Sequence, residues 1–391
     1  MKKTILHTDI QNFIEKNLTI DISKILFKGT SFTDVTTQEI VSQIQSKKKC
    51  KTKLPTWFST KNIYYPNKLN IEQTSSEITA NYKANLVFGN SLIDITGGFG
   101  VDAFAFSKKI KNVVHCEINN ILSKIVTHNY TQFQVKNIQT ISLDGIKFLE
   151  NSNKKFDWIY IDPSRRNDTK GKVFLLKDCL PNIPKNIDFL LRKSNHILIK
   201  NSPILDITSA INELKFVKEI HIIAVNNDVK ELLFILENNY LNDIKINAIN
   251  IQKNNTQLFN FKLNNKTSAT FSFPKKYLYE PNSAILKSGG FYQVSEQYNI
   301  HKLHQHSHLY TSDKLIDFPG RRFEIKHTIS FDKKQLKKLI PSKKANISTR
   351  NFPQTVAQIR KKTGIKDGGN QYLFFTTNYN NKHIVLICKK N

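Results

Sequence analysis

The 391-residue sequence lacks the features that would point to export, membrane insertion or a cysteine-bound metal. Its four cysteines lie far apart and form neither a metal-binding nor a redox spacing: Cys50, Cys116, Cys179 and Cys388. No apolar run reaches the roughly 18 to 20 residues that a membrane span needs. The N-terminal stretch MKKTILHTDI has no apolar region of about 7 to 15 residues, as a signal peptide would. We therefore expect a cytoplasmic, disulfide-free protein.

Acidic residues are also scarce, since 31 Asp and Glu stand against 59 Lys and Arg, and the formal net charge is +28. Two explanations are open: a surface that binds nucleic acid, or a composition rich in Lys, Asn and Ile throughout. The distribution of charge helps to separate them. Residues 84–240 hold 20 basic and 16 acidic residues, whereas residues 321–391 hold 17 and 3. Compositional drift alone would not place half of the excess in the tail.

A chain of this length is expected to form two to four domains. Residues 1–83 have apolar positions at helical spacing and are expected to be helical. From about Ser91, short apolar runs alternate with helical patterns, and the expected strands are SLIDI, NVVHCE, IQTISLD, FDWIYID and HILIKNS. EIHIIAV and ELLFILE then form a hairpin around Asn226, Asn227 and Asp228. This α/β pattern predicts a mostly parallel sheet that closes with an antiparallel hairpin.

The expected boundaries place this α/β domain at residues 84–250. Residues 251–319 are less regular and are expected to hold connecting strands and a small segment. Residues 320–391 are expected to form a small, basic α+β domain with three strands, and with a helix from about Pro353 to Thr363.

Candidate binding residues follow the expected strands, at the sheet edge where open α/β sheets bind ligands. The first strand leads into a glycine turn, and glycine permits positive φ and close approach of a ligand: Gly97, Gly98 and Gly100. Glu117 ends the second strand, where a carboxylate can accept from both hydroxyls of a ribose. Asp144 ends the third strand, where a side chain can reach an adenine amino group. Glycines alone are weak evidence, but the ordered set predicts a nucleoside-binding site.

The ligand class follows from the carboxylates around the turn. A dinucleotide enzyme holds a pyrophosphate at a helix N-terminus, and a turn with a purely structural role is a further alternative. Here Asp94 precedes the turn and Asp102 follows it, and two carboxylates suit the cationic methionine end of S-adenosylmethionine (SAM) better than a diphosphate. Residues 85–240 resemble class I SAM-dependent methyltransferases, which implies a Rossmann-like fold. The implied SAM site consists of Asp94, Thr96, Gly97, Gly98, Gly100, Asp102, Glu117 and Asp144.

The fourth expected strand ends in IDPSRR, residues 161–166. Enzymes that methylate the exocyclic amine of a base carry Asp/Asn-Pro-Pro-aromatic at this point, and hold the amine by positioning and electrostatics. Asp162 and Pro163 match, but Ser164 replaces the second proline and Arg165 replaces the aromatic residue. Arg165 and Arg166 are therefore candidates for clamping a phosphate, and an ion-paired loop is the structural alternative. No cysteine lies near KNSP, residues 200–203, which argues against covalent catalysis.

The chain resembles one family in particular, the bacterial RNA methyltransferases with a small ferredoxin-like segment and a THUMP-like C-terminal domain. The matching stretches are KKKCKTKLPTW, IEQTSSEITANYKA, DITGGFGVD, IDPSRR, SPILDI, YLYEPNSAILKSGGF, KANISTRNFP and KDGGNQYLFF. The resemblance implies SAM-dependent methylation of RNA, such as tRNA or rRNA. The charged tail then supplies candidate RNA-binding residues: Arg350, Arg360, Lys361 and Lys362. The alternatives are methylation of a protein or small molecule, or an RNA-binding protein with an inactive methylase domain.

Two further features have competing interpretations. Glu77 lies just before the first strand, where a segment often folds over the amino-acid end of SAM, but Ser75, Ser76 and Glu77 would equally cap a helix. Four histidines between His301 and His308 have no cysteine or carboxylate at ligand spacing, so we expect no metal there.

Overall fold

The computed structural model describes residues 1–165 and 175–391, which cluster into two compact units. The first unit contains residues 1–217 and 234–241, and the second contains residues 218–233 and 242–391. None of the described helices is long and apolar enough to cross a membrane.

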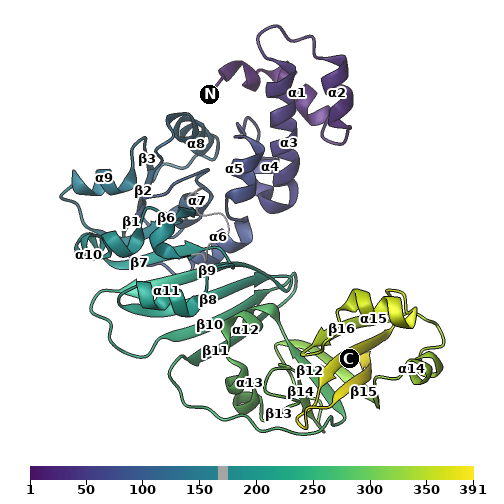
Figure 1. Cartoon of the computed structure of the whole chain (residues 1–391). Coiled ribbons are helices and arrows are strands. Elements are labelled where there is room, and N and C mark those ends of the chain that lie inside the picture. The colour runs from purple at the N-terminus through teal and green to yellow at the C-terminus, as the bar shows by residue number, and fades with distance from the viewer. Residues whose placement is uncertain (166–174) are drawn as a thin grey trace. The chain divides into compact units, whose positions relative to one another are not determined.

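The first unit begins with a helical region, as the apolar spacing predicts (Figure 1). Its helices are η1 (Lys3–Leu6), α1 (Thr8–Lys16), α2 (Ile22–Lys28), α3 (Thr37–Lys53), α4 (Pro55–Ser59), α5 (Lys68–Gln73) and α6 (Glu77–Ala84). The longest, α3, begins at a capping box in which Thr36 accepts from the Glu39 N–H and Glu39 accepts from the Thr36 N–H. A new helix follows at once because Pro55 takes its first position, where no backbone donor is needed.

A parallel sheet forms the centre of the first unit. Its parallel strands are β1 (Ser91–Asp94), β2 (Asn112–Cys116), β3 (Ile138–Ile141), β4 (Phe156–Ile161) and β7 (Ser194–Asn201), in the order β7-β4-β1-β2-β3. The intervening helices are α7 (Val101–Ser107), α8 (Asn120–Gln132), α9 (Gly145–Glu150) and α10 (Ile183–Lys193), followed by α11 (Ile207–Glu213). Strand order reverses between β1 and β4, and such reversals place a ligand-binding crevice at the carboxyl ends of the strands. The mostly parallel α/β fold is confirmed.

Two short strands and a hairpin come next along the chain. Strands β5 (Ser164–Arg165) and β6 (Cys179–Leu180) pair with each other, beside η3 (Leu176–Asp178). Strands β8 (Val217–Val225) and β9 (Asp228–Glu237) are neighbours joined by two residues, Asn226 and Asn227, both with positive φ. That two-residue turn is typical of an antiparallel hairpin, as the sequence predicts.

The second unit extends the strand pattern of the hairpin and adds a separate sheet. Strand β10 (Lys245–Ile251) pairs in parallel with β8, and β11 (Thr256–Lys262) pairs antiparallel with β10. The separate sheet has the order β13-β14-β12-β15-β18-β17-β16. Its strands are β12 (Tyr277–Pro281), β13 (His301–Lys302), β14 (Tyr310–Ser312), β15 (Gly320–Ser330), β16 (Asn346–Arg350), β17 (Gln371–Thr377) and β18 (His383–Lys390). Its helices are α12 (Ser283–Ser288), α13 (Phe291–Tyr298), α14 (Lys333–Leu339) and α15 (Val356–Thr363).

Candidate functional site

The candidate binding residues gather where the strands of the first unit end. Asp94 is the last residue of β1, while Glu117 and Asp162 directly follow β2 and β4. The third strand ends three residues earlier than the sequence predicts, at Ile141. Asp144 is instead the N-cap of α9, and its Oδ1 accepts from the Lys147 N–H at 3.0 Å. All four acids nevertheless belong to strand–helix connections at the same edge of the sheet.

The three glycines of the turn have different structural reasons. A Cβ on Gly97 would lie 2.4 Å from the His115 ring, and one on Gly100 would lie 2.2 Å from the Tyr130 hydroxyl oxygen. These two positions are therefore closed to larger residues by the protein itself. Gly98 has φ +59°, but the nearest atom to a Cβ at this position would be the Thr96 carbonyl oxygen at 3.8 Å. A Cβ at Gly98 would thus make only an ordinary van der Waals contact with the protein, which leaves room for a ligand against its backbone.

Glu117 ties the glycine turn to the following helix. Its Oε2 accepts from the Gly98 N–H at 2.8 Å, and its Oε1 accepts from the Asn119 N–H at 2.7 Å. The next residue, Ile118, is 71% exposed, and Leu143 beside Asp144 is 38% exposed. Exposed apolar side chains next to both acids offer surfaces for a flat aromatic ring. Sequence reasoning missed both, although each directly neighbours an acid that it identified.

Asp94, Thr96 and Asp162 link the ends of β1 and β4. The Asp94 Oδ1 accepts from the Thr96 N–H at 3.0 Å, and the Thr96 Oγ1 accepts from the Asp162 N–H at 2.7 Å. Asp94 is only 1% exposed. Burial raises the pKa of Asp94 well above its ordinary value, and the charges of Asp102 and Asp162 act in the same direction. Thr96, which follows β1, therefore holds the backbone N–H of the candidate catalytic residue Asp162.

Asp102 lies in a buried polar network that sequence reasoning did not identify. Its carboxylate accepts from the Ser75 and Tyr160 hydroxyls, each at 2.8 Å, and pairs with Lys83 Nζ at 3.1 Å. Burial alone would raise the pKa of Asp102, but the charges of Lys83 and Lys200, together with the bonds from Ser75 and Tyr160, outweigh it and lower the pKa. Ser75 precedes the N-cap of α6 and Lys83 lies in its last turn, so helical spacing gave no signal that the two residues meet.

Within residues 75–77, Ser76 and Glu77 bind the first turns of two helices. Ser76 is the N-cap of α6 and accepts from the Thr79 N–H at 3.2 Å. Both Glu77 oxygens accept from Thr56, from its N–H at 2.6 Å and from its hydroxyl at 2.8 Å. Glu77 therefore holds the start of α4, and its expected contact with SAM stays a prediction.

The candidate catalytic residues are described in part. Asp162 pairs with Lys200 Nζ at 2.5 Å, and Pro163 is buried. Arg165 lies in the short strand β5, and Arg166 lies outside the described residues. Sequence analysis did not identify Lys200 as a site residue and considered its stretch, KNSP, only because it contains no cysteine. Its pairing was missed because its partner lies 38 residues away in the chain.

The candidate RNA-binding residues differ in their surroundings. Arg350 Nη2 lies 2.7 Å from the Glu280 carboxylate, and Arg360 pairs with Asp367 and donates to the Ile365 carbonyl at 3.1 Å. Both arginines therefore bind acids of the second unit. Lys361 is exposed, and Lys362 is exposed with its Nζ 4.8 Å from the Phe331 ring centroid. The two lysines are therefore the more exposed of the four candidates.

The histidines between His301 and His308 make contacts within the second unit. His304 binds the side chains of Asn351 and Asn381, at 3.0 and 2.9 Å, and the His308 ring stacks on Phe291 at 3.5 Å between centroids. Over the described parts of the chain, no three His, Cys, Asp or Glu residues form a group that could hold a metal ion.

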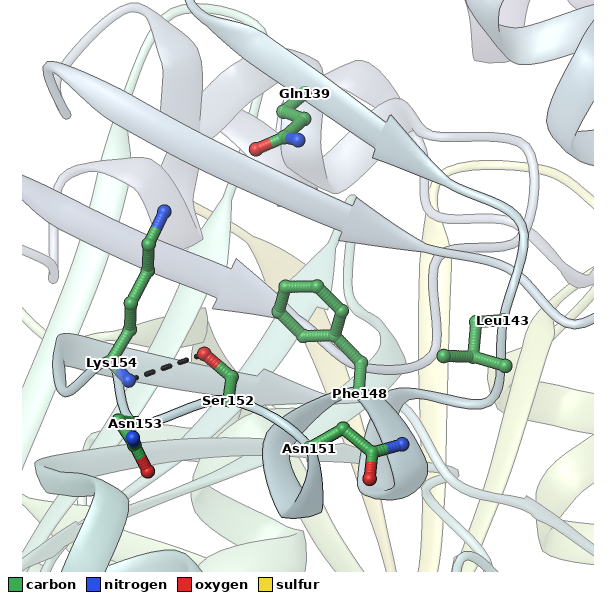
Figure 2. Close-up of a pocket in the computed structure, with 7 residues that line it drawn as sticks. All are labelled: Gln139, Leu143, Phe148, Asn151, Ser152, Asn153 and Lys154. Carbon is green, nitrogen blue, oxygen red and sulfur yellow. Dashed lines mark hydrogen bonds between the residues drawn. The ribbon is translucent and has the colours of Figure 1, made fainter.

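A separate open pocket of about 600 Å³ lies at the sheet edge formed by β3. Figure 2 shows the Phe148 ring at its centre, with Leu143 to one side and Gln139 of β3 above. Residues 151–154 complete the lining. The pocket includes Leu143 but none of the residues that the sequence predicts for cofactor binding or catalysis.

His115 is a buried histidine whose ring lies against Gly97 of the glycine turn. His115 is fully buried, and neither of its ring nitrogens has a hydrogen-bond partner among the described residues. Burial lowers the pKa of His115 to about 4, from 6.5. The unfolded chain then takes up the proton first as the pH falls below about 6.5. The contribution of neutral His115 to the free energy of unfolding is therefore fully present above about pH 6.5, and it is lost as the pH falls toward 4.

We expect His115 to remove about 2 kcal/mol from the unfolding free energy of the first unit between about pH 7.5 and about pH 5. Urea unfolding of the wild type and of His115→Leu at both pH values measures it. The variant should lose less stability on acidification, by roughly that amount. Equal losses in both proteins would contradict the assignment.

Comparisons with known proteins cover the whole chain. A family model described as a ferredoxin-like domain matches residues 277–319, and one described as THUMP domain-like matches residues 320–390. A crystal structure of a candidate methyltransferase from Porphyromonas gingivalis W83 is 30% identical, with a TM-score of 0.88, and the match covers 100% of this chain and 98% of that one. Among curated proteins, none matches by sequence.

Two other solved structures match a smaller part of the chain. One is a candidate methyltransferase from Streptococcus mutans in complex with S-adenosylhomocysteine, at 14% identity and a TM-score of 0.31. The match covers 41% of this chain and 96% of that one. The other is TrmK of M. capricolum with the same product bound, at 19% identity and a TM-score of 0.30. It covers 41% of this chain and 69% of that one.

Proposed function

We propose a function for this chain on the basis of its family. The chain belongs to the bacterial methyltransferase family that includes the Porphyromonas gingivalis protein. Its C-terminal part has the ferredoxin-like segment and the THUMP-like domain. The chain binds SAM at the carboxyl ends of β1 to β4 and methylates RNA. When bound, SAM supplies a methyl group on a cationic sulfonium. The observation that carries the proposal is the convergence of Asp94, Glu117 and Asp162 around a glycine turn at the switch point of the sheet.

The residues present fit SAM. The uncrowded Cβ position of Gly98 leaves room for a ligand to lie against the turn, and Glu117 lies beside it to accept from ribose hydroxyls. Exposed Ile118 and Leu143 provide apolar surface for an adenine ring. A diphosphate fits less well, because the Gly98 N–H already donates to Glu117 and three aspartates lie close to the turn.

Direct transfer, without a covalent cysteine intermediate, agrees with the state of the thiols. All four cysteines are buried. Burial raises the pKa of both Cys50 and Cys116 to about 12, so neither forms the nucleophilic thiolate readily at neutral pH. Asp162 and Pro163 instead offer acceptors at the end of β4 for a donor on the substrate.

Titration calorimetry of the full-length protein tests the cofactor. We expect micromolar binding of SAM, about −8 kcal/mol, and much weaker binding of NAD. Binding of NAD without binding of SAM would contradict the proposal.

RNA as the substrate is supported by the THUMP-like match and by the charge of the tail. Replacing Lys361 and Lys362 together with glutamine should weaken RNA binding, because exposed lysines neutralise phosphates and release counterions. The slope of log affinity against log salt should flatten by about 0.7 to 0.9 for each lysine–phosphate interaction that the substitutions remove. Filter binding across a salt series measures both effects.

SAM affinity is the internal control for this pair of substitutions, and it should not change. Arg360 is left in place because its bonds to Asp367 and Ile365 hold the loop after α15. RNA affinity and salt slope equal to those of the wild type would show that these lysines form a merely solvated helix face.

A further inference from the structure

Lys200 lies beside the candidate catalytic aspartate because of the register of two parallel strands. Strands β4 and β7 pair with Ile161 opposite Ile199, so the next residues, Asp162 and Lys200, are also neighbours. Lys200 Nζ lies 2.5 Å from Asp162 Oδ2. The lysine side chain is 12% exposed and that of the aspartate is 32% exposed. The ammonium group is therefore largely buried, while the carboxylate still reaches solvent.

Further charged groups near this pair come from four elements, namely β1, α7, α6 and α3. On the anionic side, Asp102 of α7 and Asp162 both act electrostatically on Asp94 of β1. On the cationic side, Lys83 of α6 pairs with Asp102, and the charge of Lys200 acts on Lys53 of α3. Burial lowers the pKa of Lys53 to about 8, and Lys200 acts in the same direction.

The three aspartates of this group have different hydrogen-bond and ion-pair partners. Asp102 has its own cation in Lys83, together with two hydroxyl donors. Asp94 accepts from Thr96. The Asp162 carboxylate accepts from Lys200, while the Asp162 N–H is held by Thr96. Lys200 thus compensates the most exposed carboxylate of the group, the one that a substrate can reach.

We propose that Lys200 is the positioning residue for Asp162, and this inference rests on the proposed function. A charge-assisted bond from Lys200 to Oδ2 fixes the orientation of the carboxylate. With Oδ2 bound to Lys200, Oδ1 accepts a hydrogen bond from a donor on the substrate. The substrate is then a base nitrogen that carries hydrogen, an amino group or a ring N–H, rather than a ring carbon.

Methyl transfer to RNA by four variants tests the pair: Lys200→Met, Lys200→Arg, Asp162→Asn, and Lys200→Met combined with Asp162→Asn. We expect Lys200→Met to lower kcat about 10- to 100-fold, the loss that follows removal of a charged hydrogen-bond partner. Its affinity for SAM should stay within about twofold of wild type. Lys200→Arg should restore most of kcat. The double variant should be no slower than Asp162→Asn alone, because Lys200 acts through Asp162.

The matched control is Lys215→Met. Lys215 also pairs with an aspartate, Asp188 at 2.8 Å, but both side chains are more than half exposed. Removing such a surface pair should leave kcat unchanged. A general effect of losing a lysine from this domain would appear in the control as well.

Three outcomes would overturn the inference: unchanged kcat in Lys200→Met, no rescue by arginine, or rate losses that multiply in the double variant. Nucleoside mass spectrometry adds a further condition, since label on a ring carbon would exclude the N–H assignment. If the wild type binds SAM but methylates no RNA, the proposed function fails instead. Urea unfolding of the same four variants then decides the pair, because additive midpoint shifts would show that Lys200 and Asp162 are not coupled.

Discussion

Replacing Asp162 with alanine should lower the rate of methyl transfer by about two orders of magnitude or more. Asp162 follows β4 directly, its backbone is held by Thr96, and its carboxylate is held by Lys200. The substitution removes the acceptor for the substrate but leaves the glycine turn and Glu117 intact. Affinity for SAM should therefore hardly change. Single-turnover kinetics with RNA and calorimetry with SAM measure the two quantities separately.

Asp188→Ala is the matched control for this experiment. Asp188 lies in the same unit on α10, is exposed, and pairs with Lys215. Its replacement should leave both the transfer rate and SAM binding unchanged. A wild-type single-turnover rate in Asp162→Ala would remove Asp162 from the mechanism.

Replacing Gly98 with valine should weaken SAM binding by about two orders of magnitude, close to loss of measurable binding. The side chain of the new residue would meet no close protein atom but would occupy the space beside the turn where the ligand is expected to lie. The positive φ of Gly98 also disfavours a β-branched residue. Calorimetry with SAM, together with a thermal melt, separates the loss of binding from loss of fold.

Gly289→Val carries the same backbone penalty without the ligand. Gly289 has φ +74° and no atom within 4 Å of the position a Cβ would take, but it ends α12 in the second unit. Both variants should lose similar stability, and only Gly98→Val should lose SAM. Wild-type SAM affinity in Gly98→Val would show that the ligand does not approach this turn.

The sequence was informative where function follows from local order along the chain. The family resemblance is confirmed, and so is the mostly parallel α/β fold. Strand ends were predictable because glycines and acids directly follow apolar runs such as SLID and FDWIYI. The third strand was predicted three residues too long because Ser142 and Leu143 continue its pattern, although Asp144 leaves the strand to cap α9.

Contacts between distant residues could not be predicted in this way. The partners of Asp102 are Ser75, Lys83 and Tyr160, from segments on both sides of the glycine turn. The pairing of Lys200 with Asp162 depends on strand register. In the tail, Arg350 was expected to meet RNA, yet its acid partner Glu280 lies 70 residues earlier. Charge patterns in a sequence identify a basic domain, but they do not tell which cations are already paired.

The central claim is that this protein methylates RNA with SAM. The most direct measurement incubates the full-length protein with methyl-labelled SAM and total RNA from a strain that lacks the gene, followed by nucleoside mass spectrometry. We expect one labelled nucleoside, methylated on nitrogen, which disappears when Asp162→Ala replaces the wild type. Bound SAM without label in any RNA nucleoside, or label that persists with Asp162→Ala, would contradict the account.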